Sequence, residues 1–487
     1  MEVMFGEWTP DLPPLKNAGA TQAKNVIPLA GPGYGSFPAL TAISTALDAY
    51  CRGMFSDKDT EGNVYSFAGN ETKLYGLVGS TWTDFSISGG YSLASDSSWE
   101  FCKFNNKCIA ATIDNDLQSV ALSGTTFADL IAGLRARHIA STNDFVIVGN
   151  TYDTSDGNMP NRVRWCAFGD ETDWTVSAAT QADYQDLEGS GGWVQAIVGG
   201  ERVYVFQERA IWMMTYVGSP VVFQFDKIDE NRGAWAEKSV ISVGNSIYFL
   251  ADDGFYVLSG NQTSPIGAGK VDTTFLADLD SSYIHRVTAA AFPEQKVVMW
   301  SYPSTASVDG TPDKVIMYNW ASQKWAFANF DHQLIYRAQS SGVTLDGLDA
   351  AGYTDLDAMT VSLDARAWMG GVLAMAAFDT SNKLGYFTGT ALDATLETGE
   401  FGGIDRSEIN EIMPIVDGGT HTVQMGTRET QAGTVSWGSA STENSSGICP
   451  VRSNSRYQRA RVNITGDFNF ALGVEVPDES IAGAGKR

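Results

Sequence analysis

The chain holds few residues arranged for catalysis. Its four histidines, His138, His285, His332 and His421, are isolated, and no His-X-X-X-His pair could place two imidazoles on one metal ion. The Gly-X-Ser-X-Gly motif that presents a nucleophilic serine in many hydrolases is also missing. A single histidine among aromatic residues more often has a structural role, so we expect no histidine-based chemistry.

Paired carboxylates are the next candidates, because a glycosidase needs one as its acid and one as its base or nucleophile. Asp114 with Asp116, and Asp252 with Asp253, form such pairs. Both lie where hairpin turns are expected, and aspartate favours turns for conformational reasons. The chain contains 57 acidic residues, so pairs also arise by chance. The two carboxylate pairs therefore do not identify an active site.

Three other patterns resemble binding motifs but are incomplete. Cys102 and Cys108 have no histidine placed to complete a zinc site. Residues 153–157 (DTSDG) lack the third-position aspartate and the distal glutamate of a calcium-binding EF-hand loop. Residues 79–82 (GSTW) match the second half of the Asp-box of sialidase-type propellers, but Leu77 stands where its aspartate belongs. We predict no catalytic residue, no metal and no cofactor.

Short apolar runs separated by turn residues dominate the chain. The clearest set has runs rich in β-branched and aromatic residues at 286–292, 297–302, 314–320 and 325–327. Each run is too short for a helix and has the composition of a strand, and prolines interrupt any helical pattern. Four sequential antiparallel strands within about 45 residues are typical of one blade of a β-propeller.

Comparable sets begin near residues 51, 99, 136, 193, 236 and 334, with a mean spacing of about 47 residues. Propeller blades repeat at roughly this interval, although tandem β-sandwiches also show strands every 8–12 residues. Trp82, Trp174 and Trp325 each follow an aromatic third run, which favours the propeller. We predict an all-β fold, a β-propeller of about seven four-stranded blades with an additional β-rich C-terminal segment.

Four regions are expected along the chain. Residues 1–50 form an irregular N-terminal arm, with a short helix over 39–50. Residues 51–400 form the propeller, with a polar insertion at 341–370. Residues 401–476 form the C-terminal β segment and an interface region, and residues 477–487 a flexible tail.

Charge is unevenly distributed over these regions. The chain has 32 basic and 57 acidic residues, a formal net charge of −25, which repels nucleic acid and anionic membranes or serves solubility alone. Arg452, Arg456, Arg459 and Arg461 concentrate positive charge near the end of the chain. They either contact an acidic partner or form intramolecular ion pairs during ring closure, and the sequence leaves both open.

Compartment signals are few. The N-terminus has no basic stretch followed by an apolar one, as a signal peptide would, and no run of 18 apolar residues could span a membrane. Five scattered cysteines indicate buried thiols in a reducing cytoplasm.

Several short motifs, taken together, resemble a known family. They are residues 5–12 (FGEWTPDL), 65–69 (YSFAG) with 72–75 (TKLY), 82–84 (WTD) with 89–91 (GGY), 99–101 (WEF), 145–150 (FVIVGN), 253–256 (DGFY), 270–272 (KVD) and 318–320 (YNW). In order and spacing they resemble the tail hub or nozzle (packaged-DNA stabilisation) proteins of short-tailed bacteriophages. The resemblance covers most of the chain, although each motif alone is unspecific.

The resemblance implies a structural virion protein and not an enzyme. Such a propeller forms a homo-hexameric ring below the portal and its adaptor, extends the DNA channel, and anchors tail fibres, tailspikes or a plug. Duplex DNA passes without specific binding, there is no membrane insertion, and the protein ends in the phage tail after assembly in the host bacterial cytoplasm. The alternative, from another class, is a glycan-binding or glycan-hydrolysing propeller used in host attachment.

Overall fold

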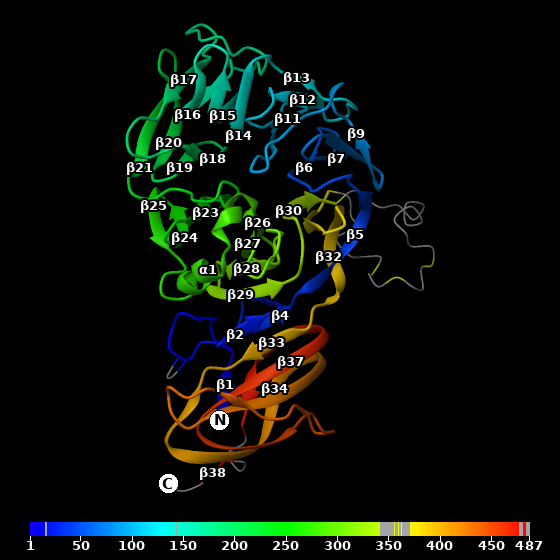
Figure 1. Ribbon diagram of the computed structural model, residues 1–487, viewed down its shortest axis with the longest axis vertical. Helices are drawn as coiled ribbons and strands as arrows, with labels where there is room; N and C mark the ends of the chain where they lie inside the picture. The colour runs from blue at the N-terminus through cyan, green and yellow to red at the C-terminus, as the bar shows by residue number, and fades with distance from the viewer. Residues whose placement is uncertain are drawn as a thin grey trace.

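A computed structural model describes residues 1–14, 17–142, 144–340, 355, 359, 362, 371–476 and the backbone of 481–483. The expected insertion at 341–370 and tail at 477–487 lie almost wholly outside these residues. The chain forms a ring of antiparallel units with an elongated sheet on one side (Figure 1). The predicted all-β propeller with a β-rich C-terminal segment is confirmed.

The described strands form six separate four-stranded sheets and a seventh four-strand unit inside a larger sheet. This agrees closely with the expected number of blades. The first three sheets are β6 (Gly53–Lys58), β7 (Val64–Gly69), β8 (Leu74–Val78) and β9 (Thr81–Asp84); β10 (Glu100–Phe104), β11 (Lys107–Ala111), β12 (Gln118–Ala121) and β13 (Ala128–Asp129); and β14 (Leu134–Thr142), β15 (Phe145–Asp153), β16 (Gly157–Trp165) and β17 (Asp183–Asp186).

The later units follow the same up-and-down order. They are β18 (Val194–Val198), β19 (Val203–Gln207), β20 (Ile211–Gly218) and β21 (Val222–Asp229); β22 (Ile241–Val243), β23 (Ser246–Ala251), β24 (Gly254–Ser259) and β25 (Gln262–Pro265); β26 (Thr288–Phe292), β27 (Val297–Tyr302), β28 (Lys314–Asn319) and β29 (Lys324–Asn329); and β30 (Leu334–Gln339), β31 (Leu373–Phe378) and β32 (Lys383–Ala391) with β5 (Pro38–Ala46). Two short helices, α1 (Asp272–Asp278) and η1 (Ser281–Arg286), link β25 to β26.

The unit β26–β29 shows why the apolar runs become inner strands. Every residue of β27 is buried between β26 and β28, and a strand covered on both faces needs an unbroken apolar sequence. Trp300 and Trp325 are fully buried with ring centroids 6.1 Å apart. The Trp300 indole donates to the Ser239 carbonyl at 3.0 Å. This hydrogen bond ties the unit to the chain entering the preceding blade.

The helix expected over 39–50 is wrong, because β5 occupies residues Pro38–Ala46. β5 pairs with β32 and completes the blade begun by β30 and β31, so the N-terminal region closes the ring. Thr41, Ile43 and Thr45 alternate along this segment, and β-branched residues favour strands. The long-range pairing overrides the local helix signals, since a strand gains its stability from its neighbour.

Two short sequence patterns predict other elements than the structure shows. Residues 174–176 (WTV) have the composition of a fourth strand for the third blade, but β17 supplies that strand. Trp174 is instead fully buried, with its indole donating to the Glu171 carbonyl at 2.7 Å.

The pair Asp253-Gly254 between two apolar runs predicts a tight turn with positive φ at its central residues. Ala251 instead pairs with Gly254, so the central residues are Asp252 and Asp253. Neither of these two has positive φ, whereas Gly254, the residue after them, has.

The elongated sheet is built on β34 (Phe401–Arg428) and β37 (Cys449–Glu475), a bulged antiparallel pair. Strands from both ends of the chain join it (Figure 1). They are β1 (Glu2–Met4), β2 (Gln22–Lys24), β3 (Val26–Pro28), β4 (Tyr34–Ser36), β33 (Ala394–Glu397), β35 (Ser436–Trp437), β36 (Ser441–Thr442) and β38 (Ile481–Gly483). Because β2 pairs with both β29 and β33, the sheet is continuous with the propeller. Among the described residues, no helix is long and apolar enough to cross a membrane.

Candidate functional site

The first carboxylate pair considered for catalysis, Asp114 with Asp116, binds neighbouring backbone and arginine groups. Asp114 accepts from the Ala94 amide at 2.9 Å. Asp116 accepts from the Gly133 amide at 2.9 Å and from Arg135 at 3.1 Å. Both side chains thus hold loops next to the second sheet.

The segment compared with a calcium loop is filled by arginine. The Asp153 carboxylate lies 3.2 Å from Arg164 and 3.6 Å from Arg162, and Arg162 also pairs with Asp156 and, at 2.7 Å, with Asp186. Guanidinium groups thus neutralise these carboxylates in place of a calcium ion. No group of three or more His, Cys, Asp or Glu side chains that could hold a metal occurs within the described ranges.

A serine–histidine pair that the sequence did not reveal lies inside the sixth blade. Ser301 Oγ is 2.6 Å from His332 Nε2, and His332 Nδ1 is 2.9 Å from the Phe330 carbonyl. Both side chains are fully buried, so a substrate has no access to the pair. The two residues are 31 positions apart in the chain, and no local motif connects them.

Burial makes His332 sensitive to acid. It lowers the pKa of His332 to about 4, against the hydrogen bond to Phe330 and the charge of Asp313, which raise it. Between pH 6.5 and 4 the unfolded chain therefore binds a proton at this position that the folded chain does not. The free energy of unfolding should fall across this window by about 3 kcal/mol from this group.

NMR titration of the His332 ring, assigned through a His332→Gln variant, tests this directly. We expect a midpoint near pH 4 in the folded protein and a smaller acid-induced loss of stability in the variant than in the wild type. A midpoint at or above pH 6 would contradict the burial argument.

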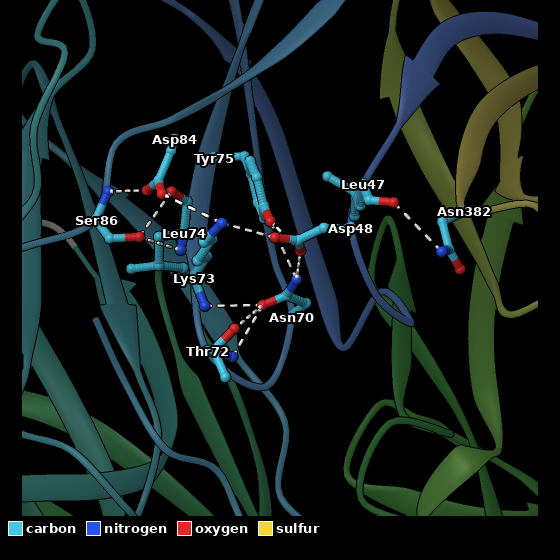
Figure 2. Close-up of polar contacts among 10 residues, drawn as sticks. All are labelled: Leu47, Asp48, Asn70, Thr72, Lys73, Leu74, Tyr75, Asp84, Ser86 and Asn382. Atoms are coloured by element: carbon cyan, nitrogen blue, oxygen red, sulfur yellow. Dashed lines mark hydrogen bonds and ion pairs between the residues drawn. The ribbon is translucent and has the colours of Figure 1, made fainter. Parts of the chain in front are cut away.

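The ring is closed at a seam between the first and last blades, formed by the link from β5 to β6 (Figure 2). On the last-blade side, the Leu47 amide donates to the Asn382 carbonyl at 2.9 Å, and Asn382 Nδ2 donates to the Leu47 carbonyl at 3.3 Å. Asn382 lies in the turn between β31 and β32. One residue of the link is thus held by two hydrogen bonds.

On the first-blade side, Asp48 is the centre of the seam (Figure 2). Its carboxylate accepts from Asn70 Nδ2 at 2.5 Å, from Lys73 Nζ at 2.7 Å and from the Tyr75 hydroxyl. Burial disfavours the charged form, but the hydrogen bonds from Lys73 and Tyr75 outweigh it and lower the pKa of Asp48. The Lys73 ammonium also lies 3.7 Å from Asp84. The contacts of Leu47 and Asp48 therefore join the last blade to the first and help to hold the ring closed.

Two of the four C-terminal arginines pair within their own sheet. Arg459 and Arg461 approach the buried Glu397 at 3.7 Å and 2.6 Å, and both guanidinium groups lie over the Trp437 ring. For these two, the structure shows the intramolecular alternative, but the pairing joins β33 to β37 and not the two ends of the propeller. Arg452 is exposed, so its side chain is accessible to a partner.

Exposed apolar side chains gather where the third and fourth sheets meet. Phe168 is 50% exposed and Tyr216 38% exposed, and both rings lie 5.5 Å from the buried ring of Phe145. Val217 and Val221, in the adjoining β20–β21 turn region, are more than half exposed. Grouped apolar exposure of this kind is typical of a protein contact surface. No sequence pattern identified this group, because Phe168 and Tyr216 are 48 positions apart in the chain.

Comparisons with known proteins bear on the fold alone. No protein-family profile and no curated protein sequence matches the chain. Among solved structures, it is similar to the extracellular domain of a protein assigned as a one-component system of B. thetaiotaomicron, with a TM-score of 0.40 and 9% identity over 82% of this chain and 47% of that one. The chain thus spans about half the length of that domain.

Two smaller propellers align over nearly their whole length. YCF48 bound to D1 peptide has a TM-score of 0.39 and 10% identity over 73% of this chain and 99% of that one. The Pan2 WD40 domain of Neurospora crassa has a TM-score of 0.40 and 7% identity over 71% and 94%. At these scores the comparisons carry no inference about function.

Proposed function

We propose that the chain is a structural virion protein, a subunit of the ring-shaped tail hub or nozzle of a short-tailed phage. In this role it extends the DNA channel below the portal and adaptor, and anchors fibres, spikes or a plug. The motif set that resembles the nozzle family is distributed over the chain from residue 5 to residue 320. Function then depends on contact surfaces and requires no catalytic residue.

The observation that carries the proposal is the elongated sheet. A propeller needs one closing strand, which β5 supplies. The strands β34 and β37, of 28 and 27 residues, are not needed for closure and form a second body beside the ring. The sheet includes strands from both ends of the chain and is hydrogen-bonded to the propeller through β2. A second body joined to the ring suits a subunit that must contact several partners at once.

The surface features fit such contacts. The apolar group around Phe168 and Tyr216 suits a neighbouring subunit, because aromatic side chains supply much of the binding energy at interfaces. Ile404, in the bulged part of β34, is 84% exposed. Arg452 is exposed on the same sheet, in β37, and offers a positive charge to an acidic partner protein.

An acidic subunit also suits a channel through which DNA slides. DNA carries one charge per about 1.7 Å of axis, and a basic wall would gain affinity by releasing counterions. The subunit has a net charge of −25. Our hypothesis places much of this charge on the channel wall, which then repels DNA over a screening length of about 8 Å at physiological salt. We expect purified protein to cause no gel shift of duplex DNA at about 150 mM salt. Stable binding there would contradict the repulsive-channel hypothesis.

Location in the particle separates the proposal from a glycan-directed function. A C-terminal tag, labelled with gold and viewed by electron microscopy of purified particles, should lie in the tail directly below the portal. The alternative is a glycan-binding or glycan-hydrolysing propeller for host attachment. It predicts a label at the periphery of the tail, or saturable binding or cleavage of host polysaccharide by the isolated chain, and either result would reject the hub.

A further inference from the structure

A small cavity lies at one mouth of the propeller axis, where the links between blades enter the innermost strands. Its volume is about 110 Å³, and it adjoins an axial cavity of about 280 Å³ with which it shares Lys238, Thr288 and Leu334. The links contribute Arg52 before β6, Lys238 before β22, and Arg286 at the end of η1. Three cationic side chains from different blades therefore line one small cavity of an acidic chain.

Two of these cations have no described carboxylate partner. Lys238 Nζ donates to the carbonyls of Arg52 at 2.9 Å and Trp99 at 3.5 Å. Arg286 donates to the Asp309 carbonyl at 3.0 Å, and its guanidinium lies over the Tyr50 ring at 5.0 Å. Neither forms an ion pair within the described ranges. The charges of Glu100 and Glu237 still act on Lys238, and that of Asp309 on Arg286, from beyond ion-pair distance.

The carboxylates closest to the cavity are engaged elsewhere. Glu100 is held by His138 at 2.9 Å, and Glu237 is held by Arg137 at 3.1 Å. Asp96 is exposed on the loop that carries Ser97. The lining of the small cavity contains no aspartate or glutamate, whereas Glu100 and Glu237 line the adjoining axial cavity. The charged side chains of the small cavity itself are therefore all cationic.

Neutral donors and a histidine complete the lining. Ser97 is 5% exposed, and its hydroxyl has no hydrogen-bond partner in the described part of the chain. A buried hydroxyl without a partner is costly, which points to a group that the protein binds. His285 also lines the cavity. Burial, together with the charges of Arg286, Arg52 and Lys238, lowers the pKa of His285 against the opposing charge of Asp96.

We infer that this mouth of the axis is a binding site for a small tetrahedral oxyanion, phosphate or the phosphate group of a small ester. Lys238 and Arg286 would provide charge, and Ser97 a hydrogen-bond donor. Arginine and lysine together with hydroxyl donors are the groups that proteins use for phosphate. The inference rests on the cavity alone and is independent of the proposed role in a virion.

Titration of the full chain with inorganic phosphate, followed by calorimetry and by the rise in melting temperature, tests the inference. We expect saturable binding of one phosphate per chain, and at least a tenfold weaker affinity in Lys238→Met and in Arg286→Gln. Arg286→Gln provides the second variant because Lys238 also holds two carbonyls and its loss could perturb folding. Lys227→Met is the matched control, since Lys227 is exposed in the fourth sheet and lies over Trp212.

The outcomes are distinct. Saturable binding that both pocket variants weaken and the control retains supports the site. Glucose 6-phosphate distinguishes the source of the group: weaker binding than phosphate indicates a free-ion site, and tighter binding indicates a site for a phosphate ester. No saturable binding, or equal weakening in Lys227→Met, would overturn the inference.

Discussion

Gly254→Val should destabilise the fifth blade by about 3 kcal/mol or more, because the substitution causes both backbone strain and a steric clash. Gly254 has a backbone φ of +140°, a conformation that residues with a side chain rarely adopt. A Cβ atom there would lie 2.2 Å from Asp272 Oδ2. The Asp272 side chain is buried, accepts from the Phe255 amide at 3.2 Å, and is confined by Gly267 on its other side. It therefore cannot move away.

The free energy of unfolding from urea denaturation measures the effect. Gly260→Val is the matched control, since Gly260 also has positive φ (+56°) but a Cβ atom there meets nothing within 4 Å. The control should cost only the backbone strain, about 1 kcal/mol. Adding Asp272→Ala to Gly254→Val should recover part of the larger loss. Equal costs for the two glycines would show that the contact with Asp272 is unimportant.

Disrupting β5 should open the ring. We expect a double substitution, Thr41→Pro with Ala42→Pro, to lower the free energy of unfolding by about 3 kcal/mol or more. Adjacent amides of a strand point in opposite directions, so one of the two prolines must remove a donor that faces β32. Thr41 and Ala42 pair with Tyr386 and Gly385 of β32. Ile43, next in the strand, packs on the core cluster of the first and last blades.

The same double substitution at Ser439 and Ala440 is the control, since both are exposed between β35 and β36. Limited proteolysis shows which part opens: cleavage of the first variant should begin near residues 38–50, next to the Asp48 seam. A variant as stable and as resistant as the control would mean that β5 does not hold the ring closed.

Most of the blade strands could be predicted from sequence because inner strands are continuous apolar runs. The runs at 297–302 and 314–320 coincide with β27 and β28 to within a residue. The closing strand was missed because its partner, β32, lies more than 300 positions away along the chain. Local features, Ser36 as a cap and Pro38 in the first turn, favoured a helix over 39–50.

The candidate sites were less predictable for the same physical reason. The Asp48 seam, the Ser301–His332 pair and the phosphate cavity each combine residues from separate blades or loops, with no spacing rule to relate them. The C-terminal arginines were visible as a charge cluster. Their partner Glu397 was not, because the pairing depends on the register of β33 against β37.

Native mass spectrometry of the chain, alone and mixed with the portal–adaptor complex of its particle, tests most directly whether it is a ring subunit of a phage tail. We expect a monomer or weak oligomers alone, because the adaptor surface is needed to template the ring, and six copies bound to the adaptor complex. A tight closed dimer of the isolated chain, or no association with the adaptor complex, would contradict the proposal.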